Sequence, residues 1–242
     1  MRFRFVDDVD RDLDAAGNMR ADVALLNQTV AGAKPVLRVY TWRRSALSLG
    51  RFQPLDDVDR AACDRYAVEV VRRPTGGRAL LHGGDLTYAV AMRRPAGRAG
   101  RVDALYRWIA TGLVAGLTRL GVDAAVAHQD GDPGAVCFAG QQGSDLRVGA
   151  RKVCGSAQVH RDGAVLQHGS VLCTRLPFDE TQLLRFRDPA DRARALDRLA
   201  TGTVTLSELG APSDARAVAD AIRSGLADAH GVVFEAAAAA FR

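Results

Sequence analysis

Clusters of strand-like segments, interrupted by helix-like segments at irregular intervals, constrain the fold of this chain more than any other feature. Three such segments follow one another with only turns between them, at Leu146–Val148, Lys152–Val159 and Ala164–Cys173. The turns lie at Gly149 and at Arg161–Gly163. A doubly wound sheet of the Rossmann type would instead alternate regularly between strand and helix. We therefore expect an α+β fold, with a mixed, largely antiparallel sheet flanked by helices on one side.

The rest of the chain fits the same architecture. Apolar residues recur at helical spacing from Asn18 to Val30, and the longest amphipathic helix is expected from Val102 to Leu120, where Gly121 ends it. The part from Phe178 onward is expected to be mostly helical. Another helix is expected at residues 56–66, a short extended piece at 204–206, and further strands at 36–42, 46–50, 68–72, 79–82 and 86–92.

Length and composition exclude several classes of protein. The chain has 242 residues, of which 48% are hydrophobic and 25% charged, close to the averages of folded soluble proteins. We expect one domain over residues 1–242, with a diverged part from about residue 178. No apolar run approaches the roughly 18 residues needed to span a bilayer. The N-terminus becomes acidic at Asp7-Asp8, before any signal-like stretch. We expect a cytoplasmic protein that does not enter a membrane.

Charge and cysteine usage narrow the partners further. The net charge of +5 is spread evenly, without a block of basic residues and with few aromatics, so it gives little support to nucleic-acid binding. An acidic protein partner or an anionic substrate fits such a surface about as well. The four cysteines lie far apart, without the spacing of zinc ligands, and we expect neither a metal nor a cofactor. They are Cys63, Cys137, Cys154 and Cys173.

Nearly all of the positive charge comes from arginine, which sets the two lysines apart. Lys34 lies in a loop-like stretch, whereas Lys152 precedes the small residues Gly155, Ser156 and Ala157 on an expected strand. Small residues on a strand leave room beside it for a slim chain. Lys152 could place an ammonium at the mouth of such a channel. The alternative is a surface lysine next to a closely packed strand.

A glycine-rich turn follows the expected strand at 68–72. Its sequence is Arg72-Arg73-Pro74-Thr75-Gly76-Gly77-Arg78, and His82 comes shortly after it. Paired glycines let the backbone approach a ligand, and successive N–H groups in such a turn bind anions or carbonyl oxygens. An ordinary hairpin turn with solvated arginines is the alternative. The turn matches neither a P-loop nor a dinucleotide fingerprint, so it does not indicate nucleotide binding.

Cys137 and His168 complete the set of candidates. Cys137 follows a stretch rich in Gly, Asp and Pro. A cation such as Lys152 would lower the pKa of its thiol and make it a strong nucleophile; otherwise it is a small buried hydrophobe. Cys154 lies within a strand and is expected simply to pack. His168, beside Gly169 on an apolar strand, either lines a pocket or is a hydrogen-bonded core histidine.

Together these stretches resemble the lipoate ligase and octanoyltransferase superfamily, which shares its catalytic fold with biotin protein ligases. The glycine turn with His82, the Gly155–Gln158 stretch after Lys152 and the Leu166–Ser170 stretch occur in the order that this superfamily shows. Residues 18–19, 42, 47–50 and 52–53 match its N-terminal pattern. The resemblance covers roughly residues 3 to 175 and implies a biotin/lipoate ligase-like catalytic domain.

Cys137-Phe138, ahead of Arg151-Lys152, indicates the branch of the superfamily. The pair resembles that of the octanoyl-acyl-carrier-protein:protein N-octanoyltransferases, in which the cysteine carries the acyl group. This resemblance implies that Cys137 takes an octanoyl group from acyl carrier protein as a thioester. A lysine of a lipoyl domain, such as that of the glycine cleavage H protein, would then accept it. Lys152 would stabilise the thiolate and the developing oxyanion.

The same resemblance implies an acyl tunnel shaped by glycines and small residues, with Arg73, His82 and His168 near its polar end. An ATP-dependent lipoate or octanoate ligase stays open as an alternative, and so does a non-catalytic protein that binds lipoyl domains or a small carboxylate. The expected substrate-binding residues are Arg73, Thr75, Gly76, Gly77, Arg78, His82, Gly155, Ser156, Ala157, His168 and Gly169.

Overall fold

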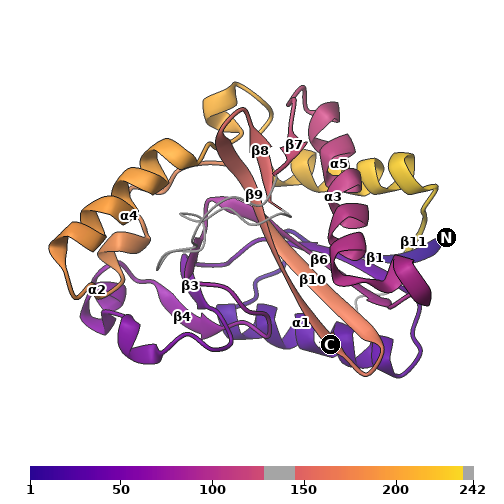
Figure 1. The fold of residues 1–242 in the computed structure, drawn as a ribbon, viewed down its shortest axis with the longest axis horizontal. Coiled ribbons are helices and arrows are strands. Elements are labelled where there is room, and N and C mark those ends of the chain that lie inside the picture. Colours follow the sequence, from indigo (N-terminus) through magenta and orange to yellow (C-terminus); the bar gives the residue numbers. More distant parts are fainter. Residues whose placement is uncertain (128–144, 237–242) are drawn as a thin grey trace.

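Two β-sheets form the centre of the computed structural model, which describes residues 1–127 and 145–236 (Figure 1). The described residues form a mixed sheet of eight strands, in the order β11-β1-β2-β6-β10-β9-β8-β7, and a small sheet in the order β4-β3-β5. The large sheet contains β1 (Arg2–Asp8), β2 (Val36–Tyr40), β6 (Asp85–Arg93), β7 (Ala125–Val126), β8 (Leu146–Val148), β9 (Arg151–Arg161), β10 (Ala164–Leu172) and β11 (Val233–Ala236). The small sheet contains β3 (Ala46–Leu49), β4 (Glu69–Arg72) and β5 (Leu80–His82). The expected α+β class with a largely antiparallel mixed sheet is confirmed.

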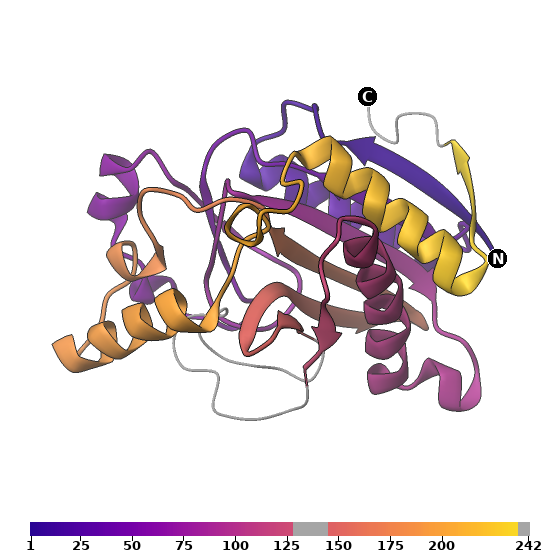
Figure 2. The ribbon, with the colours of Figure 1, turned by 90° about the horizontal axis from the view of Figure 1, so that it is seen from above.

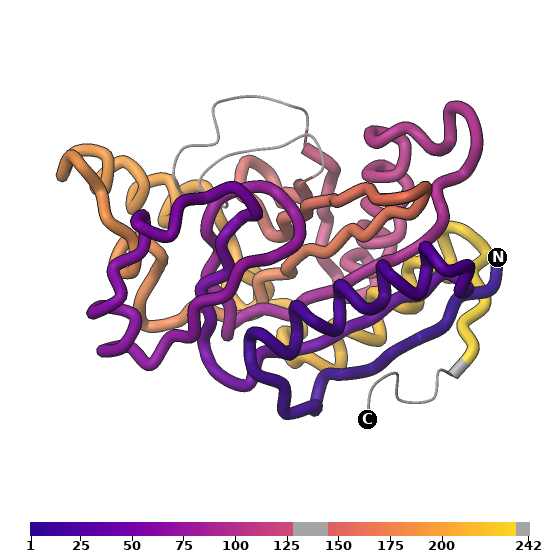
Figure 3. Tube along the Cα trace, turned by 90° about the horizontal axis from the view of Figure 1, so that it is seen from below, coloured from indigo at the N-terminus to yellow at the C-terminus, as the bar shows by residue number. Residues whose placement is uncertain are grey.

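Helices cover both faces of the large sheet, so the expectation of helices on one side is wrong. Figure 2 shows α3 and α5 over one face, and Figure 3, from the opposite side, shows α1 over the other. The reason is that β2 and β6 bury side chains on both of their faces, with only the last residue of β6 exposed. The described α-helices are α1 (Ala15–Val30), α2 (Arg60–Arg65), α3 (Val102–Arg119), α4 (Pro189–Gly202) and α5 (Ala215–His230), and the short 3₁₀ turns are η1 (Leu55–Asp57), η2 (Gly97–Gly100), η4 (Glu180–Gln182) and η5 (Ser207–Leu209).

Alternation along β6 separates two apolar cores. Val90 and Met92 belong to the core that α3 and α5 cover, whereas Ala89 and Ala91 belong to the core beneath α1. Small side chains on the α1 side let this helix approach the sheet closely. Among the helices of residues 1–127 and 145–236, none combines the length and the apolar character of a membrane-spanning segment.

One local expectation needs correction, and two strands were missed. The helix expected at 56–66 is only α2, because Asp59 caps it by accepting a hydrogen bond from the Ala62 N–H and the preceding Val58 bridges to Leu184. The strands β1 and β11, at the two ends of the chain, were not expected. They lie side by side as a parallel pair (Figure 2).

The long antiparallel hairpin of β9 and β10 brings the predicted strand residues together. His168 is paired with Ala157, and Ser170 with Gly155. Residues on these positions share one face because side chains alternate along a strand. That face carries tiny side chains on β9, and it looks toward α1 and the small sheet.

Candidate functional site

A narrow cavity lies between the two sheets beneath α1. Residues from β2, β3, β5, β6, β9 and β10 form its walls, and Met19 of α1 contributes to them. The lining consists of Met19, Tyr40, Trp42, Ser48, Arg73, Leu80, His82, Thr87, Gly155, Ser156, Ala157, His168, Gly169 and Ser170. It therefore contains seven of the expected substrate-binding residues, drawn from four separate parts of the sequence.

His82 is held on one wall by partners on both ring nitrogens. Its Nδ1 donates to Asp85 Oδ2 at 2.9 Å, and its Nε2 lies 2.8 Å from Ser48 Oγ. Trp42 stacks on the ring, with the centroids 4.0 Å apart. Burial by itself raises the pKa of Asp85, but the hydrogen bond and charge of His82 outweigh it and leave the pKa below its ordinary value. These contacts fix the orientation of the imidazole ring, which forms part of the cavity wall.

His168, on β10, has a matching arrangement. Its Nδ1 donates to Asp22 Oδ2 at 2.9 Å, and its Nε2 lies 2.7 Å from Thr75 Oγ1. This contact joins the glycine turn to β10 and to α1. The sequence left open whether His168 lines a pocket or is a satisfied core histidine, and the structure shows that it is both.

Asp22 in turn belongs to a fully buried ionic network. Arg38 Nη1 donates to Asp22 Oδ1 at 2.8 Å, and Tyr40 Oη donates to Asp22 Oδ2 at 3.0 Å. Arg38 also donates through Nε to Asp8 at 2.8 Å. Burial raises the pKa of Asp22, but the His168 hydrogen bond and the Arg38 charge outweigh it, so its pKa lies below the ordinary value. The carboxylate is thus ionised, and its hydrogen bond to Nδ1 fixes the orientation of the His168 ring.

Arg73 lines the cavity, but its guanidinium is used to shape the glycine turn. It donates to the carbonyl oxygens of Ser48, Gly76 and Arg78 at 2.9, 2.8 and 2.7 Å. Gly77 has φ +95°, a conformation that side chains disfavour. The turn also packs against Gly50, where an added Cβ would lie 1.9 Å from the Gly77 carbonyl oxygen. Thr75, Gly76, Gly77 and Arg78, the other four expected substrate-binding residues, lie outside the cavity lining.

Lys152 is neither at the surface nor in the lining of the cavity. It is 1% exposed, and its Nζ forms an ion pair with Asp145 Oδ2 at 2.9 Å. Both side chains are desolvated, and the two opposite charges compensate each other. Lys152 lies three residues before Gly155 on β9, at the start of the strand that forms one cavity wall.

The structure describes three of the four cysteines, and all three are buried. Cys137 lies outside the described residues. Cys154 is buried, and burial, reinforced by Asp145, raises the pKa of its thiol to about 12. The expectation that Cys154 packs as an inert side chain is confirmed. Burial likewise raises the pKa of Cys173 to about 12, and Cys63, Cys154 and Cys173 are free thiols.

Several residues of the site were missed from the sequence. Asp22 and Arg38 carry no local motif, because their partners lie far away in the chain. Ser48 lies within the 47–50 stretch of the family resemblance, and Asp85 follows His82 by three residues, but neither was singled out as a site residue. The sequence signal for Asp22 is an acidic residue among the apolar positions of the helix expected from Asn18 to Val30. The described residues contain no group of three or more His, Cys, Asp or Glu side chains arranged to hold a metal ion.

Comparison with known proteins places these features in a family context. The lipoyl protein ligase A/B catalytic domain matches residues 14–227. Three relatives named octanoyltransferase LipM come from Carboxydothermus hydrogenoformans, Symbiobacterium thermophilum and Kyrpidia tusciae. They are 40%, 38% and 39% identical, over 79%, 89% and 91% of this chain and 72%, 82% and 85% of their own length.

Solved structures agree at the level of the fold. A lipoate-protein ligase A bound with ATP superposes with a TM-score of 0.76 at 22% identity, over 98% of this chain and 89% of that one. A bi-partite lipoate protein ligase from Thermoplasma acidophilum gives 0.75 at 23% identity, over 98% and 87%. These likenesses confirm the expected ligase-like fold.

Proposed function

The chain belongs to the lipoyl protein ligase A/B catalytic domain family, and we infer that it is an octanoyltransferase of protein lipoylation. The observation that carries this conclusion is the identity of 38–40% to relatives of that name over most of their length. The donor is octanoyl-acyl carrier protein and the acceptor is a lysine of a lipoyl domain, such as that of the glycine cleavage H protein. Its compartment is the cytoplasm.

The proposed reaction has two steps, with Cys137 as the nucleophile. Its thiolate attacks the carbonyl carbon of the octanoyl thioester. The bond to the carrier sulfur breaks, and the carrier thiolate takes up the proton that Cys137 released. The neutral amine of the acceptor lysine then attacks the enzyme thioester. An amide forms, the bond to the Cys137 sulfur breaks, and that sulfur takes up the proton from the amine. Thioester exchange is nearly balanced and amide formation is downhill, so no ATP is needed.

Lys152 is the proposed electrostatic partner of both steps. Its buried ammonium would stabilise the Cys137 thiolate and the oxyanion of each tetrahedral intermediate. Its ion pair with Asp145 supports this role, because Asp145 holds the ammonium at the end of β9 that leads into the cavity wall. A fixed charge in a desolvated place stabilises a developing anion more than the same charge in water.

The narrow cavity is the proposed acyl site. Its hydroxyl and imidazole groups bond to one another, as Ser48 and His82 do, so they present few unsatisfied polar atoms to an alkyl chain. Gly155 and Ala157 leave space on β9. The aromatic ring of Trp42 and the Met19 side chain complete an apolar wall.

A mass measurement tests this function. Incubation with octanoyl-acyl carrier protein and no ATP should add one octanoyl group to the protein. The adduct should be lost in Cys137→Ala and kept in Cys154→Ala, the matched buried-thiol control. Transfer that requires ATP and survives Cys137→Ala would instead indicate a ligase. Binding of a lipoyl domain without consumption of either donor would indicate a non-catalytic protein.

A further inference from the structure

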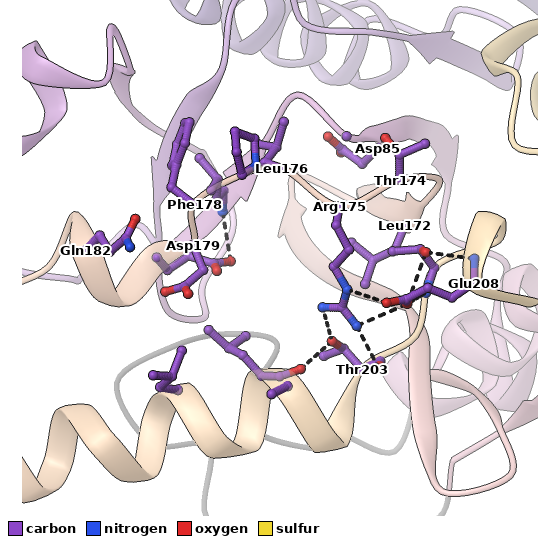
Figure 4. Close-up of a pocket in the computed structure, with 18 residues that line it drawn as sticks. Asp85, Leu172, Thr174, Arg175, Leu176, Phe178, Asp179, Gln182, Thr203 and Glu208 are labelled. Carbon is purple, nitrogen blue, oxygen red and sulfur yellow. Dashed lines mark hydrogen bonds and ion pairs between the residues drawn. The ribbon is translucent and has the colours of Figure 1, made fainter.

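A second, larger cavity lies on the other side of β5, beneath α4 (Figure 4). Its volume is about 420 Å³. One end contains Arg175, Thr203 and Glu208, and the other contains Asp179 and Gln182, as Figure 4 shows. Between them the walls are mainly aliphatic and aromatic. These apolar residues are Leu81, Leu172, Leu176, Phe178, Leu196 and Leu199.

Glu180 is the unusual member of the lining. It is only 7% exposed, and its Oε1 accepts a hydrogen bond from the Leu81 N–H at 3.1 Å. Within residues 1–127 and 145–236, no ion pair joins Glu180 to a basic side chain. Burial raises the pKa of Glu180 to about 7. A cation that enters the cavity would stabilise the ionised form of this desolvated carboxyl.

The end of the cavity that contains Asp179 and Gln182 can still accept hydrogen bonds from a ligand. Arg175 is already used by Glu208, to which its Nε donates at 3.0 Å, and by Thr203 at 2.8 Å. Gln182 Oε1 is a buried acceptor without a hydrogen-bond partner among the described residues. An ammonium supplies three donors and no acceptor, which complements this set.

We propose that this cavity receives the side chain of the acceptor lysine, with its four-carbon stem along the leucines and its ammonium at Glu180. This rests on the proposed function, which requires a lysine to reach the enzyme. The fit is one of chemistry: a cavity with mainly apolar walls contains a desolvated carboxyl, in a protein whose net charge is +5. A phosphate group would meet Asp179 and Glu180 instead, and it is not the expected occupant.

The cavity is placed where the acceptor lysine could be held before it reacts with the enzyme thioester. Thr203 of the cavity wall bridges to Lys152, and the Val204 N–H donates to the Lys152 carbonyl oxygen at 2.9 Å. The cavity therefore lies beside the start of β9, where the proposed catalytic lysine is held. Glu180 acts here as a binding and positioning residue for the incoming amine.

Kinetics on the full chain test the proposal. Glu180→Gln keeps an oxygen that can accept the Leu81 N–H but cannot become an anion. We expect its KM for the lipoyl-domain acceptor to rise about tenfold, since a hydrogen bond to a charged group is lost. Octanoyl loading from the donor should be unchanged. Asp197→Asn removes an exposed carboxylate of α4, outside the cavity lining, and should change neither quantity.

A binding measurement separates this proposal from the proposed function. The probe is N-α-acetyl-lysine methylamide, compared by NMR with the norleucine analogue, which lacks the ammonium. Shifts at the Leu81 and Leu199 methyl groups are expected for the lysine probe alone. Its affinity should increase from pH 6 to pH 8 as Glu180 ionises. The charged groups that act on Glu180 are Asp179, which raises its pKa, and Arg175, which lowers it. Arg192 of α4 donates through Nε to the carbonyl oxygen of the adjacent Thr181.

Three results overturn the proposal. The first is equal binding of both probes, and the second is displacement of the lysine probe by inorganic phosphate. The third is an acceptor KM in Glu180→Gln that matches the wild type while octanoyl transfer proceeds. If the wild type forms no octanoyl adduct at all, the proposed function fails instead, and the binding of the lysine probe still decides what the cavity recognises.

Discussion

At the scale of single residues, Asp22 determines how the cavity is built. Its carboxylate contacts Arg38, Tyr40 and His168, which come from β2 and β10. Each of these groups is buried, and none could stay so without a partner. The network therefore links α1 to two strands of the sheet. Through His168 and Thr75 it also fixes the glycine turn.

Asp22→Asn should destabilise the fold by about 3 kcal/mol, because removing one member of a buried ion pair leaves the other charge uncompensated. Asp103→Asn, which breaks exposed ion pairs on α3, should have little effect on unfolding by urea. The pKa of Asp22 lies below the 3.8 of the unfolded chain. The advantage of the wild type should therefore be complete at neutral pH and shrink as the pH falls through about 4. Equal urea midpoints for the two variants would contradict this account.

At the scale of elements, α3 and α5 approach each other through glycines. Gly112 and Gly116 lie one turn apart on α3, and both face α5 near Gly225. A Cβ added at Gly225 would lie 2.2 Å from the Gly116 nitrogen and 2.4 Å from the Gly112 carbonyl oxygen. Both contacts are to backbone, which cannot rotate away. This close packing lets the helix pair cover one face of the sheet.

Gly225→Ala should lower the free energy of unfolding by about 2 kcal/mol. The overpacking of two backbones outweighs the roughly 1 kcal/mol by which alanine favours a helix over glycine. Gly202→Ala is the control, because a Cβ there meets nothing within 4 Å at the end of α4. Urea unfolding of both variants measures the difference. A stability gain in Gly225→Ala would show that the helices separate easily, contrary to the packing described above.

At the scale of the whole molecule, the sequence predicted what neighbouring residues encode and missed what distant residues build. The glycine turn, the β9–β10 hairpin and the small residues on β9 were found because turn chemistry and side-chain size are local signals. Asp22 and His168 are 146 residues apart, so no spacing rule connects them. The strand β11 has only four residues and precedes an alanine run, which hides its period of two. The position of Cys137 relative to Lys152 stays a prediction.

The parallel pair of β1 and β11 joins the two ends of the described chain. Its loss should destabilise this edge of the sheet and leave the centre of the sheet unchanged. Phe234 packs edge-on against Phe3 and Phe5, with centroids 6.0 and 5.8 Å away. Phe234→Ala should therefore cost about 2 kcal/mol, less than the roughly 3–5 kcal/mol of a fully buried phenylalanine, because the ring is only partly buried. Hydrogen exchange should show faster opening of the β1 amides and unchanged protection at Leu166 in β10. Val233→Ala, at a side chain that is 58% exposed, should leave both rates as they are. Unchanged protection of β1 in Phe234→Ala would mean that β11 does not hold this edge of the sheet in place.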